Sequence, residues 1–350
     1  MKLSVVIPTF NNEDTIAATV ESALAQRFDG EFEVIVVIDG STDGTRAELA
    51  KFGDRIRVIE QENRGVSAAR NAGIRAAAGE YIALLDGDDS WTEDKLAKTV
   101  PVLDQNPACV AVSSNAIGVD GAGRVVSYPV TPEFRHSPTI DEMLDQIWAY
   151  LPSTVVIRRD TLLAIGGFSE EFKPEHYACE DTFIMLLVRE RGEILYVPET
   201  LVRYRRLEYF EHLANRLRSG RFEANSAEAF KKFERRFEAN TILARLTLEH
   251  FGARGRKIAA LSIDSVAREL VGLGLMAMHQ GDRTLARRCY RASIRHSPLM
   301  LKTYFRLGWA MLPSKVSDRL RPLLAPGIQR SLSGPPFSKL AESPAASRDS

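Results

Sequence analysis

The 350-residue sequence lacks any apolar run close to the roughly 20 residues that a helix needs to cross a bilayer. Cysteine is rare: Cys109, Cys179 and Cys289 are scattered and odd in number, so we expect a reducing compartment and no disulfide framework. The absence of any CxxC or HExxH spacing argues against a zinc site. Net charge is absent too, because Lys plus Arg and Asp plus Glu number 46 each, and this argues against a nucleic-acid partner.

The remaining composition is that of an ordinary globular protein, with 45% hydrophobic and 26% charged residues. The length suits one large domain plus a smaller one. At the amino terminus a single Lys precedes a short apolar run that ends at Pro8, which we interpret as a first strand and not as a signal peptide. We therefore expect a cytoplasmic protein, with peripheral contact at the inner face of the membrane as the alternative.

The most informative stretch is Tyr81–Trp91, in which a short apolar run is followed by Asp86, Asp88 and Asp89. In an open α/β sheet, ligands bind outside the carboxyl ends of the strands. Clustered carboxylates there repel one another unless a cation offsets them, and Mg²⁺ or Mn²⁺ shared with a substrate phosphate suits such ligands. Taken alone, the stretch is explained equally well by a solvated acidic turn before a helix that begins near Trp91.

The first half of the chain alternates between predicted strands and helices. This alternation predicts a mostly parallel mixed sheet flanked by helices. Asn11 or Asn12 is expected to cap the first helix. Polar residues follow three strand ends, as in a nucleotide site: Thr9, Asp39 and the acidic group Asp86 to Asp89. The four predicted strands are Leu3–Pro8, Glu33–Ile38, Ile56–Ile59 and Tyr81–Leu85.

Further elements follow to about Arg205. Glu180 and Asp181 open a predicted helix, where the helix dipole alone would explain two acidic residues. The other predictions are a helix from Trp91 to Asn106, strands at Cys109–Ser114, Ser153–Arg158, Ile194–Val197 and Leu201–Tyr204, and irregular loops or a small hairpin from Gly118 to Ser137.

From about Glu208 the apolar spacing becomes helical and glycines thin out. We predict helices at Leu270–His279, Arg283–His296 and Leu299–Leu312, the last two resembling a single tetratricopeptide-like hairpin, too few for a solenoid. Apolar and basic residues mix in Leu299–Leu324; a membrane surface would explain this, but we favour a buried face with solvated basic residues. The predicted divisions are 1–207, the helical region 208–330, and a disordered tail 331–350.

Four separated motifs, given at the end of this paragraph, occur in the same order as in the family 2 glycosyltransferases. Gly166-Gly167-Phe168 and Glu180-Asp181 continue the series, and the chain resembles this family over about Leu3 to Arg205. The resemblance implies the GT-A fold and inverting transfer of a sugar from a nucleotide diphosphate donor. One departure is Ile38, which stands where the family usually has an acidic residue. The four motifs are Val-Val-Ile-Pro-Thr-Phe-Asn (Val5 to Asn11), Asp-Gly-Ser-Thr-Asp-Gly-Thr (Asp39 to Thr45), Asn-Arg-Gly with Ala-Arg-Asn-Ala-Gly (Asn63 to Gly73) and Leu-Asp-Gly-Asp-Asp (Leu85 to Asp89).

The same resemblance implies a divalent cofactor, Mn²⁺ or Mg²⁺, and a set of site residues. Asp88 is the implied metal ligand, and Asp86 is assigned to the metal, to a metal-bound water or to the ribose. Asp181 is the implied general base, and Glu180 is a secondary candidate that orients the acceptor. The residues implied for the nucleotide are Asp39 and Arg70, which would hold the base, and Pro8 and Thr9, which would line its pocket through their backbone.

The leading hypothesis is therefore a metal-dependent glycosyltransferase that uses a UDP-linked donor and a glycan or lipid-linked acceptor to build cell-surface polysaccharide. A nucleotidyltransferase also places a carboxylate-bound metal on an α/β sheet, but it usually has basic residues in a glycine-rich loop after the first strand. Here that loop is Thr9-Phe10-Asn11-Asn12. A third hypothesis is a degenerate nucleotide-binding protein that binds partners through its helical carboxy-terminal region; the retained Asp86, Asp88 and Asp181 argue against it.

Overall fold

The computed structural model describes residues 1–127, 137–145, 150–172, 179–205, 226–279, 282–296 and 301–312. The chain forms two compact units. The first comprises Met1–Leu207 with Ile242–Ile258, and the second comprises Glu208–Thr241 and Ala259–Ser350. The segment Ile242–Ile258 thus belongs with the first unit, although it lies in the region expected to form a separate helical part. The tail predicted from 331 to 350 lies outside the described residues.

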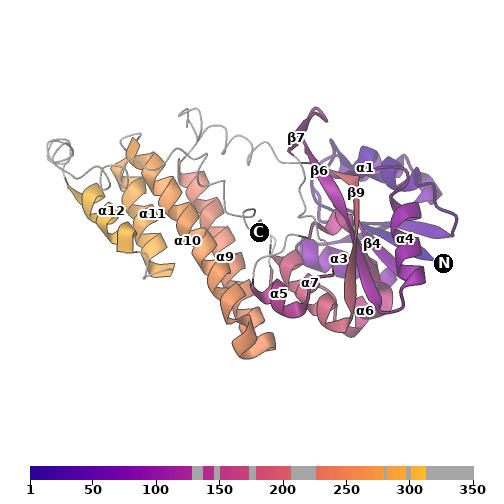
Figure 1. Ribbon diagram of the computed structural model, residues 1–350. Helices are drawn as coiled ribbons and strands as arrows, with labels where there is room; N and C mark the ends of the chain where they lie inside the picture. The colour runs from indigo at the N-terminus through magenta and orange to yellow at the C-terminus, as the bar shows by residue number, and fades with distance from the viewer. Residues whose placement is uncertain are drawn as a thin grey trace. The chain divides into compact units, whose positions relative to one another are not determined.

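The first unit contains one mixed sheet of nine strands (Figure 1). Four neighbouring strands run parallel in the order β3-β2-β1-β4, and β8 then pairs antiparallel with both β4 and β6. β9 is parallel to β6, while β5 and β7 pair antiparallel with β9 and β6. The strands are β1 (Leu3–Thr9), β2 (Phe32–Asp39), β3 (Arg57–Gln61), β4 (Tyr81–Leu84), β5 (Ser90–Trp91), β6 (Cys109–Val119), β7 (Val125–Ser127), β8 (Val155–Arg158) and β9 (Glu193–Arg205).

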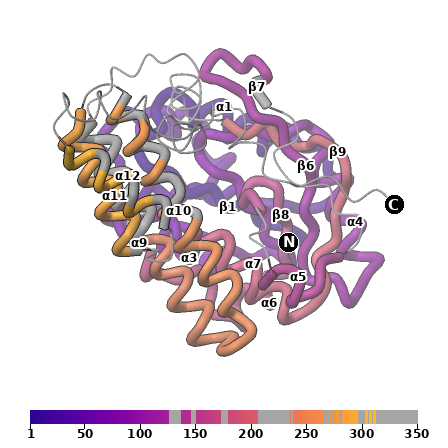
Figure 2. Tube along the Cα trace, turned by 60° about the vertical axis from the view of Figure 1, so that its left-hand side comes forward, coloured from indigo at the N-terminus to yellow at the C-terminus, as the bar shows by residue number. Residues whose placement is uncertain are grey.

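Helices cover both faces of this sheet (Figures 1 and 2), so the predicted α/β fold with flanking helices is confirmed. β1 and β4 are buried along their whole length, as expected for parallel strands covered on two sides. The elements between the strands are α1 (Ile16–Leu24), α2 (Thr45–Ala50), η1 (Gly53–Arg55), α3 (Val66–Ala76), α4 (Lys95–Gln105), α5 (Ile140–Asp145), η2 (Pro152–Thr154), α6 (Arg159–Ala164) and α7 (Glu180–Arg191).

The alanine-rich helix α3 lies against β1 and β2, and its composition follows from how close it comes. A Cβ atom at Gly73 would lie 2.4 Å from Cγ1 of Val6, which no side chain could tolerate without a shift. Ala68 and Ala69 are likewise buried. Small residues therefore let this helix bring Arg70 and Asn71, two positions from the resemblance, close to the sheet.

Several predicted boundaries were wrong because strand pairing overrides local pattern. The helix expected from Trp91 begins only at Lys95, since Ser90 and Trp91 pair with β9 as the short strand β5. The two short strands expected between 194 and 204 are one strand, β9, which continues past Pro198 through register shifts against β6. Within Gly118–Ser137, β6 and β7 form a hairpin, and residues 128–136 lie outside the described part.

The cap predicted at Asn11 or Asn12 was also wrong, because α1 begins at Ile16 and the residue before it is Thr15. Asn12 instead accepts hydrogen bonds from the hydroxyl of Thr9 and the backbone N–H of Phe10, at 3.0 and 3.1 Å. Its side chain therefore stabilises the loop after β1 and not the helix.

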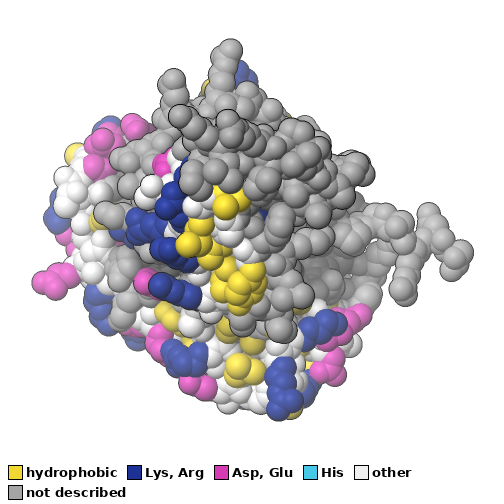
Figure 3. Space-filling model, turned by 90° about the vertical axis from the view of Figure 1, so that its left-hand side faces the viewer, with side chains coloured by type: hydrophobic (Ala, Val, Ile, Leu, Met, Phe, Trp, Pro, Cys, Tyr) yellow, Lys and Arg dark blue, Asp and Glu magenta, His cyan; other side chains and the backbone are white. Residues whose placement is uncertain are grey.

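In the carboxy-terminal region α10, α11 and α12 lie side by side (Figures 1 and 2). The predicted start of the first of these helices was wrong, because α10 begins at Arg256 and not at Leu270, and it belongs to the second unit from Ala259 onward. The core of this unit includes Leu270, Val271, Leu275, Leu285 and Tyr290. On the side shown in Figure 3, hydrophobic side chains lie beside Lys and Arg side chains. No helix in the described ranges is long and apolar enough to span a membrane. The remaining helices are α9 (Ser226–Phe251), η3 (Gly252–Gly255), α10 (Arg256–His279), α11 (Arg283–His296) and α12 (Leu301–Met311).

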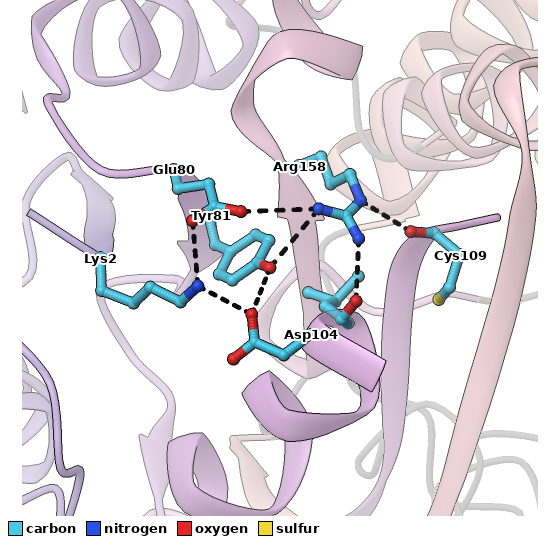
Figure 4. A network of polar contacts seen from close by, with 7 residues as sticks. Lys2, Glu80, Tyr81, Asp104, Cys109 and Arg158 are labelled. Carbon is cyan, nitrogen blue, oxygen red and sulfur yellow. Dashed lines mark hydrogen bonds and ion pairs between the residues drawn. The ribbon is translucent and has the colours of Figure 1, made fainter. Parts of the chain in front are cut away.

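A polar network closes the sheet at the amino ends of β1 and β4 (Figure 4). The ammonium group of Lys2 contacts Glu80 at 2.9 Å and Asp104 at 2.7 Å, and the hydroxyl of Tyr81 donates to Asp104 at 2.7 Å. Arg158 donates to the carbonyl of Cys109 at 2.9 Å. Burial and the hydrogen bond to Asp104 raise the pKa of Tyr81 to about 12. The network therefore connects residues at the amino ends of the parallel strands. Thr9, Asp39 and Asp86 lie at the opposite, carboxyl ends of these strands.

Replacing Asp104 with Ala is expected to lower the free energy of unfolding by about 1 kcal/mol, the usual net value of a hydrogen bond. The hydrogen bonds from Lys2 and Tyr81 outweigh burial and lower the pKa of Asp104. A folded-state pKa below its ordinary value contributes stability that is present above about pH 4 and is lost on further acidification. Thermal melts at a series of pH values should show that the melting temperature falls less on acidification below about pH 4 in the variant than in the wild type. An equal fall in the two proteins would contradict this role of Asp104.

Candidate active site

The loops after β1 and β2 are joined by hydrogen bonds, because the two parallel strands end side by side. The backbone N–H of Thr42 donates to Oδ1 of Asn11 at 2.8 Å, and the N–H of Gly44 donates to Oε2 of Glu13 at 2.7 Å. Asn11 has a positive φ of 53°, which places it in the left-handed region that Asn tolerates better than most residues. These contacts hold the loop that follows Pro8 and Thr9 against the residues that precede α2.

Asp39 is buried at the end of β2, and its carboxylate holds the loop before α3. It accepts hydrogen bonds from Nε2 of Gln61 at 2.7 Å and from the backbone N–H groups of Arg64 and Gly65 at 2.9 and 2.8 Å. A carboxylate offers about four acceptor positions, so one remains for a ligand donor. The side chain that the resemblance assigns to the nucleotide base thus also holds the loop before α3.

The loop after β4 carries the three carboxylates in different surroundings. The side chain of Asp86 is 24% exposed and pairs with Arg70. Asp88 is partly buried, and burial together with the negative charge of Asp86 raises its pKa to about 6. Burial and the charges of Asp88 and Asp86 raise the pKa of Asp89 as well. The structure therefore brings Asp86 and Asp88 together and holds them with an excess of negative charge.

Asp89 is not a ligand candidate but an anchor that sequence reasoning missed. Its carboxylate accepts a 2.5 Å hydrogen bond from the hydroxyl of Ser153 and a 2.8 Å bond from the backbone N–H of Arg205. Ser153 also accepts the backbone N–H of Asp86 at 3.0 Å, and its carbonyl accepts Nε1–H of Trp91 at 2.8 Å. One buried serine thus fixes both ends of the acidic loop. This contact could have been predicted only from the pairing of β4 with β8. Antiparallel pairing of Ala83 with Val156 places Ser153 opposite Asp86.

Replacing Ser153 with Ala is expected to destabilise the fold by about 1–3 kcal/mol, because two buried groups lose their partner. It should also weaken the binding of UDP with Mn²⁺ that the resemblance implies, since the loop that carries Asp86 and Asp88 loses its anchor. The matched control is Thr154→Val, which removes a neighbouring buried hydroxyl that bonds to Leu151 and Ser113 and not to the loop. Calorimetric titration of UDP with Mn²⁺ should separate the two variants; equal affinities would contradict the anchoring role.

Arg70 joins the acidic loop to the start of α7. It is 2% exposed, and its guanidinium contacts Asp86 at 2.7 Å and Glu180 at 2.9 Å. The ring of Phe168 lies 5.0 Å from the guanidinium carbon. Burial alone would lower the pKa of Arg70, but the charges of the two carboxylates outweigh it and raise that pKa. The resemblance assigned Arg70 to the nucleotide base, whereas in this structure its charged group is engaged by two site carboxylates.

The Gly-Gly-Phe motif, Gly166 to Phe168, binds the side chain of Asn71, the residue that follows Arg70. The side chain of Asn71 accepts the backbone N–H of Phe168 at 2.8 Å and donates to its carbonyl at 2.9 Å, as a strand partner would. Gly167 has φ of 76°, and a Cβ atom there would lie 2.4 Å from Oδ1 of Asn71. Glycine is therefore required at this position by both space and backbone conformation. The motif positions Arg70 through its neighbour and through the stacked ring of Phe168.

Glu180 and Asp181 begin α7, as predicted, and the structure gives them different surroundings. Glu180 is buried in the ion pair with Arg70. Asp181 is partly buried and accepts the backbone N–H of Thr182 at 2.6 Å. Burial and the negative charge of Glu180 raise the pKa of Asp181 to about 7, against the opposing effects of Thr182 and Arg70. A carboxylate with a pKa near neutrality has the property expected of a general base.

The donor set limits the kind of metal site this edge can form. Among the described residues, no three His, Cys, Asp or Glu side chains converge on a single point. Asp86 and Asp88 supply two carboxylates, and burial together with the negative charge of Asp86 raises the pKa of Asp88. Mg²⁺ usually binds through one or two carboxylates plus water and substrate phosphates, and does not need a complete protein cage. The residues therefore fit a divalent cation shared with a diphosphate.

Residues 4–165 match the family model described as glycosyl transferase family 2. Residues 4–165 thus have the sequence features of a family 2 glycosyltransferase domain. The chain is 32% identical over 170 residues to an uncharacterized glycosyltransferase, alr2836, of Nostoc sp., covering 46% of this chain and 52% of that protein. It is 43% identical over 119 residues to the succinoglycan biosynthesis protein ExoO of Rhizobium meliloti, covering 33% of this chain and 34% of that protein.

The glycosyltransferase domain and the helices after it also resemble a solved structure, S. aureus TarS 1-349 in complex with UDP. The TM-score is 0.50 at 21% identity, and the alignment covers 98% of this chain and 92% of that chain. This likeness shows a shared fold. The chain spans about half the length or less of the two curated relatives named above. The predicted family, fold and enzyme class are thus confirmed for the amino-terminal domain.

Proposed function

We propose that this protein is an inverting, metal-dependent glycosyltransferase that moves a sugar from a UDP-linked donor to a hydroxyl group of a glycan or lipid-linked acceptor in cell-surface polysaccharide synthesis. The observation that carries the proposal is the set Asp86, Arg70, Glu180 and Asp181, which links the acidic loop to a carboxylate with a pKa near neutrality. The relatives support the biological setting, since ExoO is named for succinoglycan biosynthesis and TarS was solved with UDP.

Each proposed role follows from the surroundings of the side chain. Asp88 and Asp86 would hold Mn²⁺ or Mg²⁺, whose chemistry is to offset negative charge on the departing diphosphate. Asp39 would contact the nucleotide base with its remaining acceptor position, and Pro8 and Thr9 would line that pocket. Asp181 would take the proton of the acceptor hydroxyl as the new bond forms on the opposite face of the sugar.

Glu180 and Arg70 receive roles that differ from those the resemblance implied. Glu180 is paired with Arg70, so we assign it to positioning and not to proton transfer. Arg70 would hold the acidic loop and the start of α7 at a fixed separation, and would lower the repulsion between Asp86 and the acidic start of that helix. The base-binding role then rests on Asp39 and on the backbone near Thr9.

The proposal is tested by thermal shift of the purified protein with UDP, GDP and dTDP, with and without Mn²⁺. A nucleotide at a hundredfold excess over its dissociation constant stabilises the folded state by roughly 2.7 kcal/mol. We expect stabilisation by UDP that depends on Mn²⁺ and is lost in Asp88→Asn. The control is Asp104→Asn, which lies in the network at the other end of the sheet and should retain the UDP response. Stabilisation by none of the three nucleotides would contradict the proposal.

A further inference from the structure

The two last described helices form an antiparallel hairpin whose charged groups are all basic. Arg283, at the start of α11, donates to the carbonyls of Ala310 and Leu312 at the end of α12, at 3.4 and 2.5 Å. The sequence from Arg283 to Leu312 contains no Asp or Glu. Its basic residues are Arg283, Arg287, Arg288, Arg291, Arg295, Lys302 and Arg306.

The basic residues are not spread evenly around α11. Leu285, Ala286, Cys289 and Tyr290 are buried in the core of the second unit. The opposite face exposes Arg288, Arg291 and Arg295, which follow the three- and four-residue spacing of one helical stripe. The buried face of α11 thus supplies packing, and its exposed stripe supplies concentrated positive charge.

Among the described positions of α12, the exposed ones carry no charge, and the exposed side chains are apolar. Tyr304 is 45% exposed and Met311 is 57% exposed, and Gly308 lies between them on the same spacing. Figure 3 shows hydrophobic side chains in a column beside Lys and Arg side chains on the side where these helices come forward. Apolar side chains next to cationic ones are the pattern of helices that lie in a membrane interface.

We propose that the α11–α12 face binds the surface of a membrane that contains anionic phospholipids. The arginine stripe would contact the lipid phosphates, and Tyr304 and Met311 would enter the headgroup region. This inference extends the sequence-based interpretation, which favoured solvated basic residues around a buried face, because the structure exposes an apolar stripe in addition to the charges. It goes beyond sugar transfer, since it concerns where the enzyme works and not what it does.

Charge decides between a membrane and a second copy of the chain. Two copies joined through this face would bring arginine stripes of like charge together. An anionic bilayer supplies the complementary charge and also accepts apolar side chains. The whole chain has a net charge of zero, so attraction to an anionic surface cannot come from the net charge of the molecule.

The test is flotation of the full chain with vesicles of phosphatidylcholine, with and without phosphatidylglycerol. We expect binding to the anionic vesicles that weakens at high salt. The variant Arg288→Gln/Arg291→Gln/Arg295→Gln should lose affinity by on the order of a hundredfold at low salt. The matched control is Arg27→Gln/Arg46→Gln/Lys51→Gln, which removes the same charge from exposed residues of the first unit and should bind like the wild type.

A second variant, Tyr304→Ser/Met311→Ser, tests the apolar stripe and should weaken binding without changing its salt dependence. Circular dichroism and the UDP thermal shift of the same preparations report on folding and on the donor site independently of lipid. No binding of the wild type to anionic vesicles, or equal binding by the two triple variants, overturns the proposal. A dimer in solution that dissociates in the arginine variant and binds no vesicles overturns it in favour of self-association.

Discussion

Asp181→Asn is expected to reduce turnover by about a hundredfold to ten-thousandfold, the usual contribution of general acid–base catalysis. The amide cannot accept the proton of the attacking hydroxyl, while its size and its bond to Thr182 are largely preserved. Nucleotide binding should be unchanged, because Asp39, Asp86 and Asp88 remain in place. The measurement is the rate of UDP release from a UDP-sugar with water as the acceptor, which needs no knowledge of the natural acceptor.

The pH dependence gives the same prediction a second, independent measurement. Because burial and the charge of Glu180 raise the pKa of Asp181 to about 7, the wild-type rate should fall as pH drops through that value. The stability effect has the opposite sign: a raised folded-state pKa favours the protonated form, so stability is lost as pH rises through about 7. Asp181→Asn should therefore melt no lower than the wild type above that pH. Full turnover in a folded variant would refute the assignment of the base.

Glu180→Gln is the matched control for Asp181→Asn, since it changes the neighbouring carboxylate in the same way. Glu180 contacts Arg70 and not the acceptor in our account, so its loss should act through position. We expect a smaller fall in rate than in Asp181→Asn. The pH at which the rate drops on acidification should be lower than in the wild type, because the charge that raises the pKa of Asp181 is removed. An unchanged pH for this drop would show that Glu180 has no electrostatic influence on Asp181.

Arg70→Met is expected to lower the free energy of unfolding by about 3–5 kcal/mol, the cost of breaking a buried ion pair from one side. Asp86 and Glu180 would lose their shared cation, and Asp181 would lose a positive charge that lowers its pKa. Turnover should fall together with stability. Chemical denaturation measures the first effect, and UDP release measures the second.

The double variant Arg70→Met/Glu180→Gln shows whether the loss comes from uncompensated charge. Removing the charge of Glu180 in the Arg70→Met background should restore part of the stability, with a coupling energy of about 1–3 kcal/mol between the two sites. Arg70→Lys serves as the conservative comparison, because it keeps the positive charge but replaces the two separated terminal nitrogens, Nη1 and Nη2, that contact Glu180 and Asp86 with a single nitrogen. Strictly additive effects would contradict the bridge.

The sequence allowed the first half of the fold to be predicted because its pattern is local. Apolar runs at Leu3–Pro8 and Tyr81–Leu85, separated by short helical stretches, leave few alternatives to a parallel sheet. Since parallel strands end at one edge, the placement of Thr9, Asp39 and the acidic loop followed from the same pattern. The ordered motifs added the family, which the match to the family model confirms for residues 4–165.

The parts that could not be predicted depend on contacts between distant residues. Ser153 anchors the acidic loop only because β8 inserts antiparallel between β4 and β6. The bridge from Arg70 to Asp86 and Glu180 joins residues that lie up to 110 positions apart. The short strand β5 replaced the first turn of a predicted helix because β9 supplies pairing partners that no local pattern reveals. Residue type indicated these side chains, but only the topology assigns them their roles.

The measurement that tests the central claim most directly is proton NMR of the sugar released from an α-linked UDP-sugar in the presence of Mn²⁺. Spectra recorded before the free sugar equilibrates identify the anomer that forms first. Single displacement with Asp181 as the base predicts the β anomer, formed at a rate that Asp181→Asn reduces. Initial formation of the α anomer, or an unchanged rate in that variant, would contradict the mechanism proposed for this domain.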